Sequence, residues 1–294
     1  MFNDALSVDY NTIHRLLRCA RNIDVYFHLP NINTIDNSLF TIQNMIILIT
    51  GATSGFGKAI ALKFAREGHN CIITGRREDK LKKVADEIAK HNVQVLPLVL
   101  DVQDRKAVGN TITSLEQRWQ NIDVLVNNAG LALGRDTFDK ADIDDWDTMI
   151  DTNVKGLLYM SKAVLPYFIK NKKGHIINIG STAGKEVYEK GNVYCASKFA
   201  VNAISQAQRI DLLPHRIKVT CINPGAAETE FSNVRFKGDE QKAAAVYTGY
   251  QPLQANDIAD VVYYCSTLPP NVCINDLVMT SIAQANSFYT YKQG

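Results

Sequence analysis

The chain has 294 residues, a formal net charge of +2 and a hydrophobic content of 46%, so it can bury a large core without disulfides or metals. Acidic and basic residues alternate along the sequence and form no basic patch, so we expect no nucleic-acid partner. No apolar run approaches the roughly 18 residues that a membrane-spanning helix needs, so we also expect a soluble protein with no membrane partner.

The six cysteines show neither a C-x-x-C pair nor neighbouring histidines. Such a set is typical of reduced thiols in the cytoplasm, and it predicts neither a disulfide framework nor a metal site. We therefore expect a cytoplasmic protein without a bound metal. The cysteines are Cys19, Cys71, Cys195, Cys221, Cys265 and Cys273.

Residues 1–44 differ in composition from the rest of the chain, with many Asn and Asp and only one short apolar patch. Arg15, Arg18 and Arg21 follow helical spacing, as in a mitochondrial presequence, but the acidic residues of the segment argue against one. We expect 1–44 to be a poorly ordered extension and 45–294 to be the catalytic domain.

The stretch 45–58, MIILITGATSGFGK, combines a buried-strand pattern with three glycines and the start of an amphipathic helix. Glycine lets the backbone turn sharply and brings its N–H groups within reach of a phosphate, and the following helix N-terminus favours negative charge. The spacing G-x-x-x-G-x-G differs from the common G-x-G-x-x-G, and Ala52 and Ala59 exclude the phosphate loop of nucleoside triphosphatases. We expect a dinucleotide site here; the alternative is a glycine-rich turn without a ligand.

From Met45 onward, short apolar strands alternate with amphipathic helices. This alternation predicts a parallel sheet with helices on both faces, hence one doubly wound α/β domain of Rossmann type. Ligands of such sheets lie beyond the C-terminal ends of the strands, and in this chain those ends carry small, polar or charged residues. Strands are expected at 46–50, 71–74, 93–100, 122–126, 175–179 and 217–222, and helices at 58–67, 78–91, 104–119, 146–170 and 193–213.

The end of the second predicted strand indicates which dinucleotide binds. NAD sites usually place a carboxylate here, at the ribose hydroxyls, whereas this chain has Gly75-Arg76-Arg77 and no acid before Glu78. A carboxylate repels a 2′-phosphate, but a guanidinium binds it with paired, charged hydrogen bonds. Arg76 and Arg77 therefore predict NADP(H); the alternative is that they are only the solvated start of a charged helix.

Tyr194 and Lys198 are four residues apart at the start of a predicted helix, so their side chains lie on one face. A nearby ammonium would lower the pKa of a phenol far enough for it to exchange protons near neutrality. We expect Lys198 to supply this field and Ser181 to hydrogen-bond the substrate oxygen. Asn153 would anchor a water that passes protons to Lys198. The alternative is a surface Tyr and Lys on an amphipathic helix.

Together these motifs resemble the short-chain dehydrogenase/reductase family from Met45 to about Gln284. The resemblance implies a mainly seven-stranded parallel sheet and a catalytic set made of Ser181, Tyr194, Lys198 and Asn153. The matching motifs are Thr50-Gly51-x-x-x-Gly55-x-Gly57, Asn127-Asn128-Ala129-Gly130, Asn153, Ser181, Tyr194-x-x-x-Lys198, and Pro224-Gly225 with Thr229. The cofactor-binding residues that we expect are Gly51, Thr53, Ser54, Gly55, Phe56, Gly57, Arg76, Arg77, Asp101, Val102, Asn128, Tyr194, Lys198, Pro224, Gly225, Thr229 and Phe231.

Within this family the sequence looks most like the NADP-dependent 3-hydroxy acid dehydrogenases, which act on serine and L-allo-threonine and reduce malonic semialdehyde. The matching stretches are NNAGLALG at 127–134, HIINIGSTAG at 175–184 and TEFSNVRFKGD at 229–239. In the last stretch we expect Arg235 to bind the substrate carboxylate bidentately, with Ser181 and Tyr194 completing the substrate site. The alternative for Arg235 is a rim cation in a mobile loop.

The sequence departs from the family pattern at two places, and two other functions remain as alternatives. The 44-residue extension has no counterpart in the family, and Glu228 places an acid near the predicted nicotinamide loop. The substrate could instead be a ketoacyl or sugar carbonyl, or the protein could sense NADP(H) without catalysis. The complete catalytic set argues against the last reading. The family resemblance also suggests a homotetramer packed through the two long helices.

Overall fold

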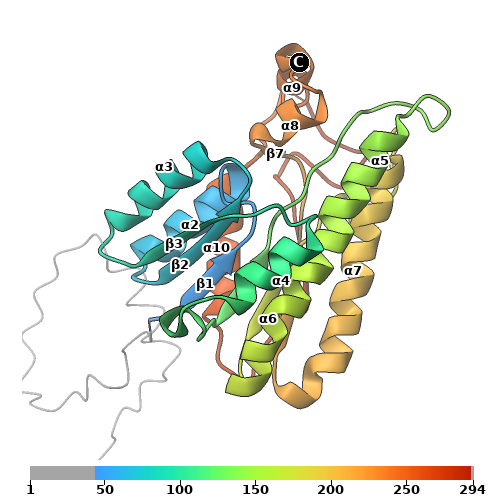
Figure 1. The fold of residues 1–294 in the computed structure, drawn as a ribbon. Helices are drawn as coiled ribbons and strands as arrows, with labels where there is room; N and C mark the ends of the chain where they lie inside the picture. Colours follow the sequence, from blue (N-terminus) through green and yellow to red (C-terminus); the bar gives the residue numbers. More distant parts are fainter. Residues whose placement is uncertain (1–43, 293–294) are drawn as a thin grey trace, which may run out of the picture. The chain divides into compact units, whose positions relative to one another are not determined.

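Strand β1 (Ile46–Ile49) lies inside a seven-stranded parallel sheet of order β3-β2-β1-β4-β5-β6-β9 (Figure 1). The computed structural model describes residues 44–292, so the predicted extension at 1–44 lies, except for Asn44, outside the described residues. The strand order reverses between β1 and β4, the position at which doubly wound sheets bind ligands. The predicted fold class is confirmed. The other strands of this sheet are β2 (Asn70–Gly75), β3 (Val95–Val99), β4 (Val124–Asn127), β5 (His175–Ile179), β6 (Lys218–Pro224) and β9 (Asp276–Met279).

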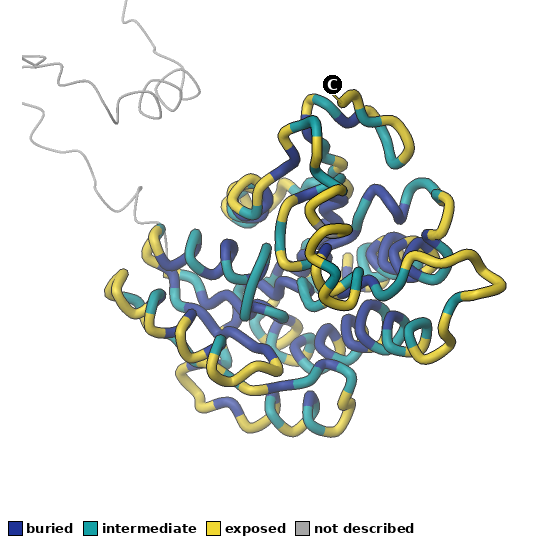
Figure 2. Tube along the Cα trace, turned by 90° about the horizontal axis from the view of Figure 1, so that it is seen from above, coloured by how far each residue is buried: buried dark blue, intermediate teal, exposed yellow. Residues whose placement is uncertain are grey.

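Helices cover both faces of the sheet because its central strands are apolar on both sides. In β1, Ile47 and Ile49 pack in one buried cluster and Ile46 and Leu48 in another, as the alternation of side chains along a strand requires. Figure 2 shows buried segments, in dark blue, gathered in the interior of the described residues. The long helices are α2 (Gly55–Arg66), α3 (Glu78–Ala89), α4 (Arg105–Thr113), α5 (Ile143–Ile150), α6 (Leu157–Asn171), α7 (Asn192–Leu212) and α10 (Ala255–Ser266).

Two predicted helices differ from the structure. The helix expected at 104–119 ends at Thr113, whose hydroxyl donates to the carbonyl of Gly109, and a short 3-10 turn follows at Gln117–Trp119. Side-chain hydrogen bonds of this kind compete with the helical pattern. The helix expected at 146–170 starts earlier, at Ile143, and contains a π-helical turn at Asp151–Gly156. Such turns are frequent at functional sites.

Smaller elements after β6 cover the C-terminal edge of the sheet. They are a two-stranded sheet of β7 (Ala227–Glu228) and β8 (Leu253–Gln254) and two short helices, α8 (Glu230–Arg235) and α9 (Glu240–Ala245) (Figure 1). The sequence did not predict β9, an edge strand whose residues alternate between exposed and half-buried. None of the helices within residues 44–292 is long and apolar enough to cross a membrane.

Candidate active site

A cavity of about 920 Å³ opens at the C-terminal edge of the sheet. Its walls come from the loop after β1, from the ends of β2 to β6, from α8 and α9, and from the C-terminal segment. Two predicted site residues, Gly57 and Asn153, are not part of its lining. The other predicted site residues in the lining are Gly51, Thr53, Ser54, Gly55, Phe56, Arg76, Arg77, Asp101, Val102, Asn128, Ser181, Tyr194, Lys198, Pro224, Gly225, Thr229, Phe231 and Arg235.

The glycine loop leaves no room for side chains at two positions. Gly51 has a φ of +67°, and a Cβ there would lie 2.9 Å from the Cα of Ala129. A Cβ at Gly57 would collide with the Gly51 carbonyl oxygen and the amide of Asn128. That amide donates to the carbonyls of Thr50 (2.8 Å) and Gly51 (3.1 Å), so Asn128 fixes the loop from behind. The N-terminus of α2 carries no side-chain cap, and its N–H groups can bind an anion.

Arg76 and Arg77 both line the cavity at the end of β2, and their partners differ. Arg76 is 58% exposed and lies 3.7 Å from a carboxylate oxygen of Asp101. Arg77 donates to the hydroxyls of Thr53 (2.8 Å) and Ser54 (2.9 Å) in the glycine loop. It also donates to Glu230 at the start of α8, at 3.1 Å. Two guanidinium groups therefore line the cavity near the glycine loop, where a 2′-phosphate of a dinucleotide would need them.

Ser181, Tyr194 and Lys198 come from two elements and meet at the cavity. Ser181 follows β5 and caps the short 3-10 helix Thr182–Gly184, accepting from the N–H of Ala183 at 3.1 Å. Tyr194 and Lys198 lie one turn apart in α7, and both are buried. Ser181 lies close enough to the Tyr194 phenol to lower the pKa of the phenol against the effect of burial. The structure thus brings together three of the four predicted catalytic residues, and the surface alternative for Tyr194 and Lys198 fails.

The protonation of this pair differs from the sequence prediction. Burial raises the pKa of the Tyr194 phenol above its ordinary value, whereas we expected it to fall. The Lys198 ammonium lies 6.0 Å from the centre of the Tyr194 ring and donates instead to the carbonyl of Ile179, at 2.9 Å. Burial lowers the pKa of Lys198 to about 8. At the phenol, desolvation therefore outweighs the effects of Ser181 and Arg235, which lower the pKa of Tyr194.

Asn153 lies behind the cavity wall, in the π-helical turn between α5 and α6. Its side chain accepts from the N–H of Leu131 and donates to the Leu131 carbonyl, both at 2.8 Å, and also donates to Ser197 at 3.0 Å. A Cβ on Gly130 would lie 3.2 Å from the Asn153 amide oxygen and 3.6 Å from the Lys198 nitrogen. The missing side chain of Gly130 therefore leaves space between these two residues.

Arg235 and Lys237, the two cations of the stretch 229–239, have different surroundings. Arg235, at the end of α8, lines the cavity and donates to the Tyr188 hydroxyl at 3.0 Å. Its Nε is buried and has no hydrogen-bond partner. Lys237 instead forms an ion pair with Asp145 at 2.9 Å. Glu228 is exposed and accepts from Gln254 at 3.3 Å. It is not among the residues that line the cavity.

The structure adds lining residues that the sequence analysis missed. Tyr188 faces Arg235, and the C-terminal segment 284–292 contributes to the wall. Gln284 accepts from the N–H of Ala226 at 2.8 Å and so holds the loop after β6. Nothing in the sequence marks the residues of 284–292, because only the path of the chain after β9 brings them to the cavity. Among the described residues, no group of three or more His, Cys, Asp or Glu is placed to hold a metal ion.

Comparison with known proteins agrees with this architecture. The family model for short chain dehydrogenases matches residues 45–240. The NADP-dependent 3-hydroxy acid dehydrogenase YdfG of Escherichia coli (strain K12) is 49% identical over 242 residues, which are 82% of this chain and 96% of that protein. Sulfoacetaldehyde reductase 2 of Chromohalobacter salexigens is 45% identical over 245 residues, which are 83% of this chain and 97% of that protein.

A solved structure extends the match to three dimensions. The closed form of serine dehydrogenase complexed with NADP+ superposes with a TM-score of 0.80 and 47% identity, covering 85% of this chain and all of that one. The residues that the sequence analysis took as family motifs lie within the matched range or around the same cavity. The chain belongs to the short chain dehydrogenase family.

Proposed function

We propose that this protein transfers a hydride between NADP(H) and a short 3-hydroxy acid or its 3-oxo form. The observation that carries the proposal is the position of Arg235. Its guanidinium carbon lies 5.5 Å from the centre of the Tyr194 ring, and its buried Nε lacks a partner. A carboxylate bound there would place the carbonyl of a short substrate beside Tyr194. Two relatives support the proposal by name, a 3-hydroxy acid dehydrogenase and a serine dehydrogenase with NADP+.

The residues around the glycine loop fit NADP(H). Side chains at Gly51 and Gly57 would collide with Ala129 and Asn128 and would displace the loop, and the uncapped start of α2 offers N–H groups to a pyrophosphate. Arg76 and Arg77 would hold the 2′-phosphate, and Asp101 and Val102 line the wall next to them. Thr229, Phe231 and the Pro224-Gly225 turn would cover the nicotinamide side. When bound, the nicotinamide supplies or accepts the hydride.

Tyr194 would act as the acid in the reductive direction. Its raised pKa keeps the phenol protonated near neutral pH, so it can donate a proton to the oxygen of the substrate carbonyl. The Ser181 hydroxyl, which lies at the same cavity, would hold the same oxygen. In the oxidative direction the Tyr194 phenolate would take the proton from the substrate hydroxyl. Arg235 helps there, because its positive charge lowers the pKa of Tyr194 against the effect of burial.

Lys198 and Asn153 would renew the proton of Tyr194. A lysine whose pKa is about 8 gains and loses a proton close to physiological pH. The space at Gly130 lies between the Lys198 nitrogen and the Asn153 amide oxygen. A water there would have polar partners on two sides, which supports the predicted relay from Asn153 to Lys198. Lys198 would also bind the nicotinamide ribose.

We further propose a cytoplasmic homotetramer that packs through α6 and α7. Support comes from large apolar side chains on these helices that remain exposed, such as Leu158 (42%), Phe199 (41%) and Ile210 (74%). The five cysteines of the described residues are free, as in reducing compartments. Mass measurement in solution tests the assembly.

A substrate panel tests the proposed function. Purified protein is mixed with NADP+ and serine, L-allo-threonine, 3-hydroxyisobutyrate or 3-hydroxypropionate, and the absorbance of the reduced cofactor is followed. Reduction of a 3-ketoacyl thioester, a sugar carbonyl and sulfoacetaldehyde by NADPH is measured in parallel. We expect turnover with the 3-hydroxy acids and with NADP+ in preference to NAD+. Tight binding of NADPH without turnover of any carbonyl would instead support the non-catalytic sensing function.

A further inference from the structure

Two buried amides, Asn202 and Asn223, lie directly behind the turn that carries Ser181. Asn223 in β6 is fully buried, and its amide oxygen accepts from the N–H of Ser181 at 3.2 Å. A Cβ on Gly180 would collide with the same oxygen, so the turn and the amide are in direct contact. Neither amide lines the cavity. They can therefore affect the reaction only through the residues that they hold.

The orientation of the Asn223 amide is decided by Asp276 in β9. The amide nitrogen donates to a carboxylate oxygen of Asp276 at 2.6 Å and approaches the Leu277 carbonyl at 3.5 Å. The other carboxylate oxygen accepts from Lys185 at 2.6 Å. A carboxylate accepts hydrogen bonds and cannot donate one. The amide nitrogen must therefore face Asp276, which leaves the amide oxygen for Ser181.

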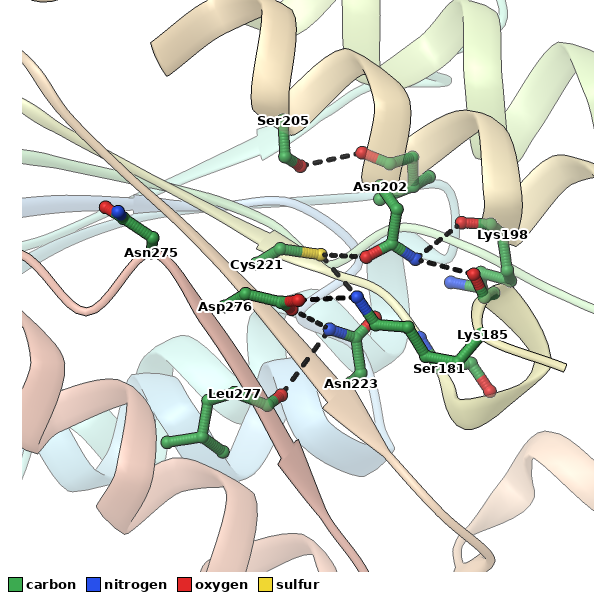
Figure 3. Close-up of polar contacts among 12 residues, drawn as sticks. Ser181, Lys185, Lys198, Asn202, Ser205, Cys221, Asn223, Asn275, Asp276 and Leu277 are labelled. Atoms are coloured by element: carbon green, nitrogen blue, oxygen red, sulfur yellow. Dashed lines mark hydrogen bonds and ion pairs between the residues drawn. The ribbon is translucent and has the colours of Figure 1, made fainter. Parts of the chain in front are cut away.

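Asn202 in α7 holds the other end of the same turn. Its amide nitrogen donates to the carbonyls of Gly184 (3.2 Å) and Lys198 (3.1 Å). The thiol of Cys221 lies between the two amides, 3.5 Å from the oxygen of Asn202 and 3.6 Å from that of Asn223 (Figure 3). The turn that presents Ser181 is thus fixed at its start by Asn223 and at its end by Asn202, which also binds the backbone of Lys198.

We propose that Asn223 is a positioning residue, which sets the place of the Ser181 hydroxyl relative to Tyr194 through the chain Lys185, Asp276, Asn223 and the N–H of Ser181. The inference rests on the proposed function, because the position of Ser181 matters only if Ser181 holds the reacting oxygen. A shift of Ser181 weakens its hydrogen bond to that oxygen during the reaction. Asn223 forms hydrogen bonds with Ser181, Asp276 and Leu277 and not with the glycine loop or Arg76, so the proposed dinucleotide contacts should not change. A defect at Asn223 should therefore lower kcat and leave NADPH binding intact.

The variant Asn223→Asp tests this with almost no change in volume. The new carboxyl still offers an oxygen to the Ser181 N–H, but its second oxygen faces Asp276 at the former 2.6 Å contact. Two carboxylates this close repel unless they share a proton. We expect the ratio of variant to wild-type kcat to fall as pH rises from mildly acidic to mildly alkaline, by up to about 100-fold, the cost of misplacing a reacting group by about 1 Å.

The double variant Asn223→Asp with Asp276→Asn restores an amide–carboxylate pair with the partners exchanged. We expect it to recover at least about tenfold of the lost kcat, as compensation at an interacting pair requires. The matched control is Asn178→Asp, another fully buried amide in a strand, which binds Asn127, Ser205 and Gln208 away from the Ser181 turn. This control should lower the melting temperature without changing the pH dependence of kcat.

Three measurements on each protein decide the matter: kcat across pH, the Kd of NADPH from fluorescence, and the melting temperature. The proposal is supported if Asn223→Asp loses kcat with pH, keeps the wild-type Kd and is rescued by the second change. It is overturned if the kcat ratio is independent of pH, if rescue is absent, or if Asn178→Asp shows the same profile. A wild-type protein without hydroxy acid turnover would instead contradict the proposed function, and binding of NADPH distinguishes the two failures.

Discussion

The guanidinium carbon of Arg235 lies 5.5 Å from the centre of the Tyr194 ring and equally far from that of Tyr188. One cation thus stands over the face of the phenol that would exchange the proton, in the arrangement of a cation–π contact. In the proposed function, a substrate carboxylate on Arg235 would keep the rest of a short molecule between the guanidinium and the Ser181 turn.

Replacing Arg235 by Ala should discriminate against charged substrates. A hydrogen bond to a charged group contributes about 1.5–3 kcal/mol, so kcat/KM for 3-hydroxypropionate should fall about 10- to 100-fold. Its methyl ester, which lacks the carboxylate, should lose much less. The ratio of the two kcat/KM values is the measurement. Lys237→Ala is the matched control, because Lys237 pairs with Asp145 outside the cavity lining. An equal loss for acid and ester would show that Arg235 does not bind the carboxylate.

Arg76 and Arg77 should decide the choice of cofactor. In the double variant Arg76→Ala with Arg77→Ala, the 2′-phosphate loses its charged donors, and we expect the Kd of NADPH to rise about 10- to 100-fold. The Kd of NADH should change little, because it has no 2′-phosphate. Fluorescence titration with both cofactors measures the two constants. Wild-type protein that binds NADH as tightly as NADPH would contradict the role of the two arginines.

Glu230 connects the two walls of the cavity on the cofactor side. Its carboxylate accepts from Arg77 (3.1 Å) and from Lys80 (3.0 Å), which ties the start of α8 to the start of α3. The pairs are about half exposed, so they stabilise the fold little. Arg77 and Glu230 nevertheless line the cavity, so the pairs connect two of its walls where we propose that the dinucleotide binds. The Glu230→Gln variant should release NADPH about two- to fivefold faster, as expected for a weakened exposed ion pair. A stopped-flow displacement experiment measures the release rate. An unchanged rate would show that the pairs do not restrain release.

The buried ammonium of Lys198 should destabilise the folded protein. Its pKa falls from 10.5 to about 8 on burial, so between these values the unfolded chain binds more protons than the folded one. Folding stability therefore rises with pH across this window, and the full cost of the buried charge is present below about pH 8. Lys198→Met should raise the melting temperature by about 2–4 °C near neutral pH, for a gain of about 1 kcal/mol.

The pH dependence of the melting temperature separates the removal of the buried Lys198 charge from a general gain in apolar packing. The advantage of Lys198→Met should shrink between about pH 8 and 10.5, where the wild-type lysine loses its proton. The same change at the exposed Lys82 of α3 is the matched control and should show no such dependence. An advantage that stays constant with pH would contradict the account. So would a melting temperature below that of the wild type at neutral pH.

Much of the fold followed from local patterns. Apolar strands with helices between them predicted the sheet, and the glycine spacing placed the loop that now lines the cavity. The edge strand β9 was missed because its half-exposed residues show no continuous apolar run. Helix ends were wrong at Thr113 and Ile143, and the π-helical turn around Asn153 was missed. At Thr113 a side-chain hydrogen bond competes with the helical pattern.

The site was predictable in its residues and less so in its energetics. The motifs named Ser181, Tyr194 and Lys198, but spacing does not reveal how far a side chain is removed from water. The direction of the pKa shift at Tyr194 was therefore wrong. Partners that come from distant segments were also hidden. The contact of Glu230 with Arg77 spans 153 positions, and no local pattern encodes it.

The most direct test of the central claim is the turnover of 3-hydroxypropionate with NADP+ by wild type and by Tyr194→Phe, together with the Kd of NADPH for both. The account predicts that the wild-type protein forms NADPH. The variant, which lacks only the hydroxyl, should lose at least about 100-fold in kcat, as for a missing general acid–base. Its Kd for NADPH should stay within about twofold of the wild-type value, well below the tenfold change that 1.4 kcal/mol would cause. A Tyr194→Phe protein that turns over at the wild-type rate would contradict it.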